Sequence, residues 1–233
     1  MYSEFKQFLD NKKILIMCKG NFVTPIKKNY DIYIGVKQSI AILPQKDVLV
    51  MNDFEGVFGL EDYFKEIKYI VFPNVPHLRQ KPSIIAKNKL LKYLSLHNFN
   101  GKIINYEILS NNNPNPKMEI IRNTRNSGDI IYHFLNMCKN IIFVDVYGMY
   151  SSIDDNKDIT NVVLNAKIHP EYKEYYDSYI YRVYKNKPDG NKKMITAATN
   201  LDKKDAKNIN EMFQHLQNKL KQSYPKLNLN FVN

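Results

Sequence analysis

Apolar runs that end at small or polar residues recur along the first half of the chain. Residues 14–18 are apolar at every position, which is typical of strands buried on both faces of a parallel sheet. Polar or glycine residues such as Gly20 and Asp53 follow closely on these runs. By the same criterion the sequence predicts strands at residues 14–18, 32–36, 47–51, 67–72 and 103–109.

Helical periodicity separates or follows these runs. Residues 84–96 form the best helix of the first half, and Ser83 stands where an N-cap is expected. A second helix follows Gly128 and leads into an apolar strand that ends at Gly148. Residues 205–223 have an amphipathic pattern, and residues 227–232 alternate like a terminal edge strand.

This alternation of strands and helices predicts an α/β fold, a Rossmann-like and mostly parallel sheet flanked by helices. We expect the core in residues 1–150, a small lid or variable region in residues 151–200, and a helix and strand in residues 201–233 that complete the core. Residues 110–116, rich in Asn and Pro, predict a loop, and residues 151–158 predict irregular structure.

The chain of 233 residues has a formal net charge of +11, and 44% of its residues are hydrophobic. A core is therefore expected, and the charge favours an anionic partner such as a phosphorylated ligand, nucleic acid or an acidic surface. Lysine, asparagine and isoleucine are abundant throughout while tryptophan is absent, so compositional bias explains part of this charge.

Several features predict a soluble, cytoplasmic protein. No apolar run approaches the roughly 18–20 residues that a membrane-spanning helix needs. The N-terminus lacks the charged-then-apolar plan of a signal peptide. Cys18 and Cys138 lie in apolar stretches, where buried thiols are expected rather than a disulfide framework.

The segment Asn126-Ser127-Gly128 is the strongest candidate for ligand chemistry. It opens a helix, and helix N-termini present unpaired N–H groups that suit an anionic ligand. The strand that follows ends at Tyr147 and Gly148, and ligands of open α/β sheets lie beyond such strand ends. The sequence contains no phosphate-binding glycine loop, no metal-ligand spacing and no nucleophile elbow.

Taken in order, the Gly20-Asn21 turn, residues 30–36, residues 46–53 and the segment 126–148 resemble the sialyltransferase-like glycosyltransferases. The resemblance covers roughly residues 12–150. It implies a single Rossmann-like domain with a lid and transfer of a sugar from CMP-sialic acid or a related donor to a glycan hydroxyl. It implies no metal and no further cofactor.

Carried to this chain, the resemblance implies that Gly20 and Asn21 lie near the nucleotide, and that Asn126, Ser127 and Gly128 lie near the sugar or phosphate of the donor. Each turn also fits an ordinary strand end or helix cap. Lys37 stands where the family has an asparagine that contacts the donor. It either pairs with phosphate or marks a site that has lost the original activity.

Two further polar residues, Asn52 and Asp53, follow the third predicted strand and are candidates for substrate binding. Asp53 suits a hydrogen bond to a ribose or an acceptor sugar, and it equally suits a helix cap. His77 follows a strand end bounded by prolines and is a candidate for the rim of the pocket.

Sugar transfer needs a base for the acceptor hydroxyl and hydrogen-bond donors for the departing phosphate. The catalytic histidine of the family lies between the signature strand and the last helix, and His169 is the only histidine in that interval. Tyr150 and then Tyr147 are the candidate donors. The alternatives are a surface histidine and tyrosines packed in the core.

Two other functions stay open. The first is a nucleotide-binding protein on the same fold without catalysis. Lys37 favours it, and so does the absence of a histidine from residues 196–202, the stretch before the last helix where the family has one. The second, less favoured, is a nucleic-acid-binding protein, because residues 185–193 are basic and follow a tyrosine-rich stretch. No nucleic-acid recognition motif is present.

Overall fold

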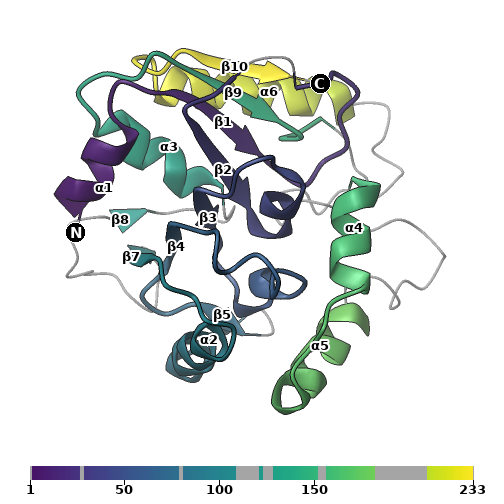
Figure 1. The fold of residues 1–233 in the computed structure, drawn as a ribbon. Coiled ribbons are helices and arrows are strands. Elements are labelled where there is room, and N and C mark those ends of the chain that lie inside the picture. The colour runs from purple at the N-terminus through teal and green to yellow at the C-terminus, as the bar shows by residue number, and fades with distance from the viewer. Residues whose placement is uncertain are drawn as a thin grey trace.

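The computed structural model confirms an α/β fold built on one all-parallel sheet (Figure 1). The structure describes residues 2–26, 29–78, 81–108, 121–122, 128–151, 156–181 and 209–232.

Eight strands form the sheet in the order β10-β9-β1-β2-β3-β4-β7-β8. Their bounds are β1 Lys13–Met17, β2 Ile32–Val36, β3 Val48–Val50, β4 Tyr69–Pro73, β7 Lys102–Ile108, β8 Ile121–Arg122, β9 Phe143–Tyr147 and β10 Leu229–Val232. A separate antiparallel pair consists of β5 His77–Leu78 and β6 Lys81–Pro82. Each strand that the sequence predicts is present within about two residues, and β10 lies at the edge as expected.

Helices cover both faces of the sheet. The α-helices are α1 Tyr2–Leu9, α2 Ile84–Leu96, α3 Asp129–Asn136, α4 Lys157–Leu164, α5 Lys173–Ile180 and α6 Ile209–Ser223. The 3₁₀ helices are η1 Lys37–Ile42, η2 Phe54–Val57 and η3 Pro170–Tyr172. The Ser83 hydroxyl accepts a hydrogen bond from the Ile85 N–H, which confirms the predicted cap of α2.

Alternate side chains of the strands enter two separate cores. Ile14 and Ile16 of β1 pack on the face covered by α1, α3 and α6. Leu15 and Met17 pack on the opposite face, together with η1, η2, α2, α4 and α5. Both faces are therefore buried, which explains why the strand sequences are apolar throughout rather than alternating.

The strand order contains one reversal. From β1 the chain adds β2, β3, β4 and β7 on one side, and it then returns to place β9 and β10 on the other side of β1. In open parallel sheets, ligands bind beyond the carboxyl ends of the strands at such a switch point. We therefore expect a ligand site at the edge formed by the carboxyl ends of β1, β2, β3 and β9.

A buried carboxylate links distant parts of this sheet. Asp145 of β9 accepts hydrogen bonds from the Tyr30 hydroxyl at 2.7 Å and from the Asn230 carboxamide of β10 at 2.9 Å. Burial, followed by the contacts with Asp145 and Tyr147, raises the pKa of Tyr30, so Tyr30 stays a donor. The network satisfies the carboxylate and fixes β10 against β9.

Three of the α-helices among the described residues were not expected from the sequence. They are α1, α5 and α4, of which α4 begins inside the stretch predicted to be irregular. The Asn156 carboxamide caps α4 by accepting a hydrogen bond from the Asp158 N–H, while Ile159 and Val163 bury one face of the helix. A short amphipathic helix of this kind depends on tertiary packing more than on local propensity. The predicted loops at 110–116 and 185–193 lie outside the described residues.

Cys18 is buried, Cys138 is half-buried, and both are free thiols. Burial raises the pKa of Cys138 to about 11, so this thiol stays protonated at neutral pH. None of the helices among the described residues combines the length and the apolar character needed to cross a membrane.

Candidate functional site

Polar side chains gather beyond the carboxyl ends of β2, β3 and β4. Lys37 follows β2, Asn52 and Asp53 follow β3, His77 lies in β5, and Tyr106 comes from β7. We call these five residues the edge cluster. Three of them, Lys37, Asn52 and Asp53, are substrate-binding candidates from the sequence, and the structure brings them together.

Backbone contacts place His77 beside Asp53. The His77 N–H donates a hydrogen bond to the Asn52 carbonyl at 2.9 Å, and Asp53 and His77 form an isolated parallel bridge. Pro73 ends β4 and Pro76 directly precedes β5, and the chain between them turns back along the end of β3. The histidine is therefore held by main-chain geometry rather than by a flexible loop.

The Asp53 carboxylate lies between a lysine and a histidine. One oxygen, Oδ2, pairs with the Lys37 ammonium group. The other oxygen, Oδ1, lies 3.6 Å from His77 Nδ1. The three side chains are 25%, 26% and 29% exposed, so a ligand can reach them while much of their surface is shielded from water.

The charge of Lys37 is stabilised by its surroundings. Burial works to lower the pKa of Lys37, but the nearby Asp53 carboxylate and Tyr179 outweigh it, and the pKa is raised above its usual value. Lys19 at the end of β1 is close enough to oppose this shift. Lys19 thus adds a second positive charge to this edge of the sheet, which favours an anionic ligand.

A buried tyrosine fixes the side chain of Asn52. Asn52 is 4% exposed, and its carboxamide oxygen accepts a hydrogen bond from the Tyr106 hydroxyl. Tyr106 is fully buried, and burial, followed by Asp53 and Asp129, raises its pKa well above the usual value. Tyr106 consequently acts as a fixed donor, and the orientation of Asn52 is set before any ligand arrives.

Unusual backbone conformations mark two of the strand ends. Lys37 after β2 has a φ of 56°, and Tyr150 after β9 has a φ of 52°. Residues other than glycine adopt this left-handed region at a cost of roughly 1–3 kcal/mol, and such residues concentrate at functional sites. Both positions were site candidates from the sequence.

The Gly20 and Gly148 turns lie directly against each other. The Gly20 N–H donates a hydrogen bond to the Gly148 carbonyl at 2.9 Å. A Cβ atom on Gly20 would lie 2.5 Å from that oxygen, and one on Gly148, whose φ is 66°, would lie 2.4 Å from the Gly20 oxygen. Backbone packing at the end of the sheet thus accounts for both glycines. Asn21 is exposed beside this contact, and its carbonyl accepts a hydrogen bond from Ser151.

The helix start singled out in the sequence is described only in part. Asn126 and Ser127 lie outside the described residues, whereas Gly128 is buried and precedes Asp129 at the start of α3. The Asp129 carboxylate adds to the effect of burial in raising the pKa of Cys18, which follows β1. The start of α3 therefore lies at the same edge of the sheet as the end of β1.

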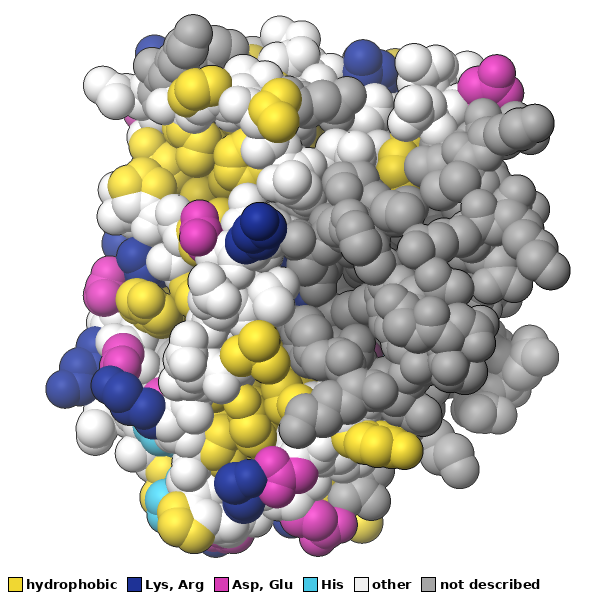
Figure 2. Space-filling view, turned by 90° about the vertical axis from the view of Figure 1, so that its right-hand side faces the viewer, with side chains coloured by type: hydrophobic (Ala, Val, Ile, Leu, Met, Phe, Trp, Pro, Cys, Tyr) yellow, Lys and Arg dark blue, Asp and Glu magenta, His cyan; other side chains and the backbone are white. Residues whose placement is uncertain are grey.

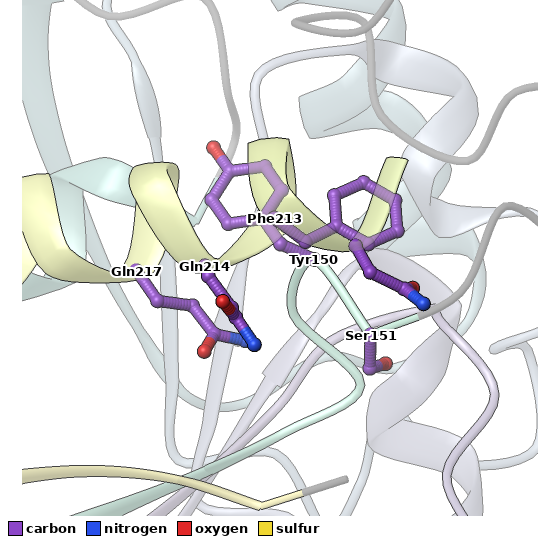
Figure 3. A pocket seen from close by; sticks show the side chains of 6 residues that line it. Tyr150, Ser151, Phe213, Gln214 and Gln217 are labelled. Carbon is purple, nitrogen blue, oxygen red and sulfur yellow. The ribbon is translucent and has the colours of Figure 1, made fainter. Parts of the chain in front are cut away.

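The two candidate tyrosines occupy different places. Tyr147 is 4% exposed and packs edge-on against Phe22, with the ring centroids 5.4 Å apart. It belongs to the core, which is the alternative left open by the sequence. Tyr150 lies on the other face and lines a cavity of about 280 Å³ beside α6 (Figure 3).

The structure does not bring His169 to the edge cluster. Its Nδ1 caps η3 by accepting a hydrogen bond from the Glu171 N–H at 3.3 Å. Glu171 pairs with Lys92 in the second half of α2, and this half runs back toward the start of β7 at the amino edge of the sheet. His169 lies in the expected interval of the sequence, between the strand that ends at Gly148 and the last helix, but it does not reach the candidate site.

From the sequence, His77 was a candidate only for the rim of the pocket, and neither Tyr106 nor Tyr179 was predicted to belong to the site. The one local signal for His77 is its position after a strand end with two prolines. Among the described residues, no group of three or more His, Cys, Asp or Glu side chains is arranged to hold a metal ion. The edge cluster can hold an anion and can transfer a proton through His77.

Comparison of the chain with protein-family models finds no match, and neither do comparisons with curated proteins and with solved structures. The resemblance to sialyltransferase-like enzymes stays a prediction from the motifs.

Proposed function

We propose that this protein transfers a sugar from a CMP-activated or related nucleotide donor to a glycan hydroxyl, and that the edge cluster is its catalytic centre. The observation that carries the proposal is the arrangement of Lys37, Asp53 and His77 beyond the strand ends, next to the switch point of the sheet. The resemblance noted in the sequence supports the choice of donor.

Each member of the cluster has a role in this reaction. The Asp53 carboxylate beside Nδ1 favours the histidine tautomer with the proton on that nitrogen, so Nε2 is free to accept a proton. Nε2 of His77 takes the proton of the acceptor hydroxyl as its oxygen bonds to the anomeric carbon. The bond from that carbon to the phosphate oxygen breaks, and the electron pair leaves with the nucleotide.

The lysines stabilise the leaving group. Negative charge grows on the phosphate during transfer, and fixed cations stabilise it most where water is partly excluded. Lys37 and Lys19 supply two positive charges at this edge. His77 replaces His169 as the proposed base, because His77 lies beside Asp53 in the cluster whereas His169 caps η3. The 3.6 Å between His77 Nδ1 and Asp53 Oδ1 shortens to a hydrogen bond when substrate binds.

A second candidate function is nucleotide binding without turnover. The ion pair between Lys37 and Asp53 favours it, because an ammonium group already neutralised by a carboxylate attracts phosphate less strongly. Binding of CMP without transfer to any acceptor would support this candidate.

Nucleic-acid binding has less support. On the described part of the face in Figure 2, lysine and acidic side chains are intermixed rather than segregated. Among the described residues, several lysines form exposed ion pairs, such as Lys92 with Glu171 and Lys173 with Asp177. A nucleic-acid surface needs a basic stripe. The basic segment 185–193 lies outside the described residues.

Calorimetric titration with CMP and CDP tests the proposal. We expect metal-independent binding that Lys37→Met weakens about ten- to hundredfold, since a hydrogen bond to a charged group contributes roughly 1.5–3 kcal/mol. Lys173→Met is the matched control because Lys173 also pairs with an aspartate but lies on exposed α5. Absence of binding at millimolar nucleotide, or equal affinity in both variants, would contradict the proposal.

A further inference from the structure

A cavity of about 280 Å³ lies between the turn that follows β9 and the first half of α6. The described residues that line it are Tyr150, Ser151, Asn210, Phe213, Gln214 and Gln217. We call it the α6 pocket. Figure 3 shows the side chains of Gln214 and Gln217 extending from the helix on the same side as Ser151.

The described residues that line the α6 pocket are mainly polar and uncharged. They contribute three carboxamides and two hydroxyls, and none of these six residues carries a formal charge. Carboxamides donate and accept hydrogen bonds at once, as do the hydroxyl groups of sugars. An ionised ligand would lose hydration here without gaining a counter-charge from the lining. A neutral ligand with several hydroxyl groups matches this chemistry.

Two of the polar side chains are held in place before a ligand enters. Gln217 Nε2 donates a hydrogen bond to the Met149 carbonyl at 3.1 Å, which leaves its Oε1 as an acceptor. The Ser151 hydroxyl donates to the Asn21 carbonyl at 2.8 Å and retains its capacity to accept. Fixed partners of this kind lower the entropy lost on binding.

The aromatic residues do not offer a surface for stacking a nucleobase. Phe213 and Tyr150 are each 6% exposed, and their rings pack on each other with centroids 6.2 Å apart. Pockets for drug-sized ligands span roughly 300–1,000 Å³, so this smaller cavity suits a single compact unit. Its size and its buried rings favour one sugar ring over a nucleoside.

We infer that the α6 pocket binds one neutral sugar residue. The pocket adjoins the end of β1, because Ser151 bonds to Asn21. The contact between Gly20 and Gly148 stands next to it at the same edge of the sheet. Identifying the bound sugar as part of the acceptor glycan rests on the proposed transferase function, whereas binding of a neutral sugar by itself does not.

Saturation-transfer NMR on the full chain tests this inference, with methyl β-galactoside, methyl β-glucoside and methyl α-mannoside as probes. At least one glycoside should bind, and Gln214→Ala should weaken it about tenfold, the effect of losing one well-placed hydrogen bond. Gln222→Ala is the matched control, because Gln222 is an exposed glutamine of α6 outside the pocket. Asn210→Ala provides a second variant if Gln214→Ala fails to fold.

The outcomes separate this inference from the proposed function. Glycoside binding that depends on Gln214 supports the pocket even when CMP does not bind. No binding of any of the three glycosides, with or without CMP, overturns it, and so does equal binding by the Gln214 and Gln222 variants. Displacement of a bound glycoside by cytidine overturns it as well, because the pocket would then hold a nucleoside.

Discussion

The edge cluster and the α6 pocket lie at the same edge of one sheet yet differ in chemistry. In the cluster, Lys37, Asp53 and His77 form a chain of charged or titratable groups. In the pocket, amides and hydroxyls surround a neutral space. We therefore propose different ligands for the two regions, an anion at the cluster and a neutral sugar at the pocket.

The two regions differ because their polar side chains are stabilised in different ways. The cluster holds a carboxylate and a lysine that are only about a quarter exposed, so each charge needs the other. The pocket holds Gln217 through a main-chain carbonyl and needs no charge. Under the proposed function, the nucleotide donor binds at the cluster and the acceptor sugar binds in the pocket.

The largest expected effect comes from removing the proposed base. His77→Gln should lower the rate of sugar transfer about 100-fold or more while binding of CMP is retained, since general base catalysis contributes about 10²–10⁴-fold. The rate is measured by release of CMP in the presence of a glycan acceptor.

His169→Gln is the matched control for this experiment. His169 caps η3 and is not part of the cluster, so its loss should change the rate by no more than about twofold. A large fall for His169→Gln with no change for His77→Gln would move the chemistry away from the edge cluster.

The next effect concerns the contact between the turns that follow β1 and β9, beside the α6 pocket. Gly148→Ala places a methyl group 2.4 Å from the Gly20 carbonyl at a φ of 66°. We expect a loss of roughly 2–4 kcal/mol in the free energy of unfolding, from overpacking and backbone strain together. Urea denaturation followed by circular dichroism measures it.

Gly56→Ala is the comparison for this substitution. Its added methyl group lies 3.1 Å from Cβ of Met51 and 3.2 Å from that residue's sulfur, and Gly56 has no left-handed φ. The loss of stability should therefore be smaller than for Gly148→Ala. Equal losses would show that the contact between Gly20 and Gly148 can relax.

The smallest effect is a pH dependence that belongs to neither region. Burial lowers the pKa of His97, with His169 acting in the same direction and Glu61 and Asp62 opposing it. The unfolded chain then binds a proton at higher pH than the folded one, so stability is retained above the usual histidine pKa and falls as pH drops through the folded pKa.

This trend can be separated from ligand binding. Between about pH 7.5 and pH 5 the wild type should lose more stability than His97→Phe, in which a ring still packs on Tyr93. Thermal unfolding at each pH measures the difference. If stability changed equally with pH in the wild type and in His97→Phe, another group would be responsible for the titration.

Much of the fold was predictable because its signals are local. Apolar runs such as residues 32–36 have no alternative to a buried strand, and Ser83 marks the start of α2 by its own side chain. Helices α1, α4 and α5 were not predicted, because only two residues of each are buried in the core. Their stability comes from the sheet beneath them, which no short window of sequence contains.

The site was predictable where it depended on strand ends alone. Lys37, Asn52 and Asp53 follow strands directly, so the parallel sheet brings them to one edge. His77 and His169 could not be ranked in the same way. A main-chain bridge to Asp53 holds His77 at the cluster, whereas the ion pair between Glu171 and Lys92 holds the segment of His169 against α2. Both placements depend on tertiary contacts.

The strand order also sets a schedule for synthesis. β1 is bordered by β2, which begins at Ile32, and by β9, which begins at Phe143. A chain emerging N-terminus first can therefore pair one side of β1 long before the ribosome has made the partner for the other. An unpaired apolar strand edge invites pairing with neighbouring chains. Aggregation of nascent chains, more than of the finished protein, is the hazard that this arrangement creates.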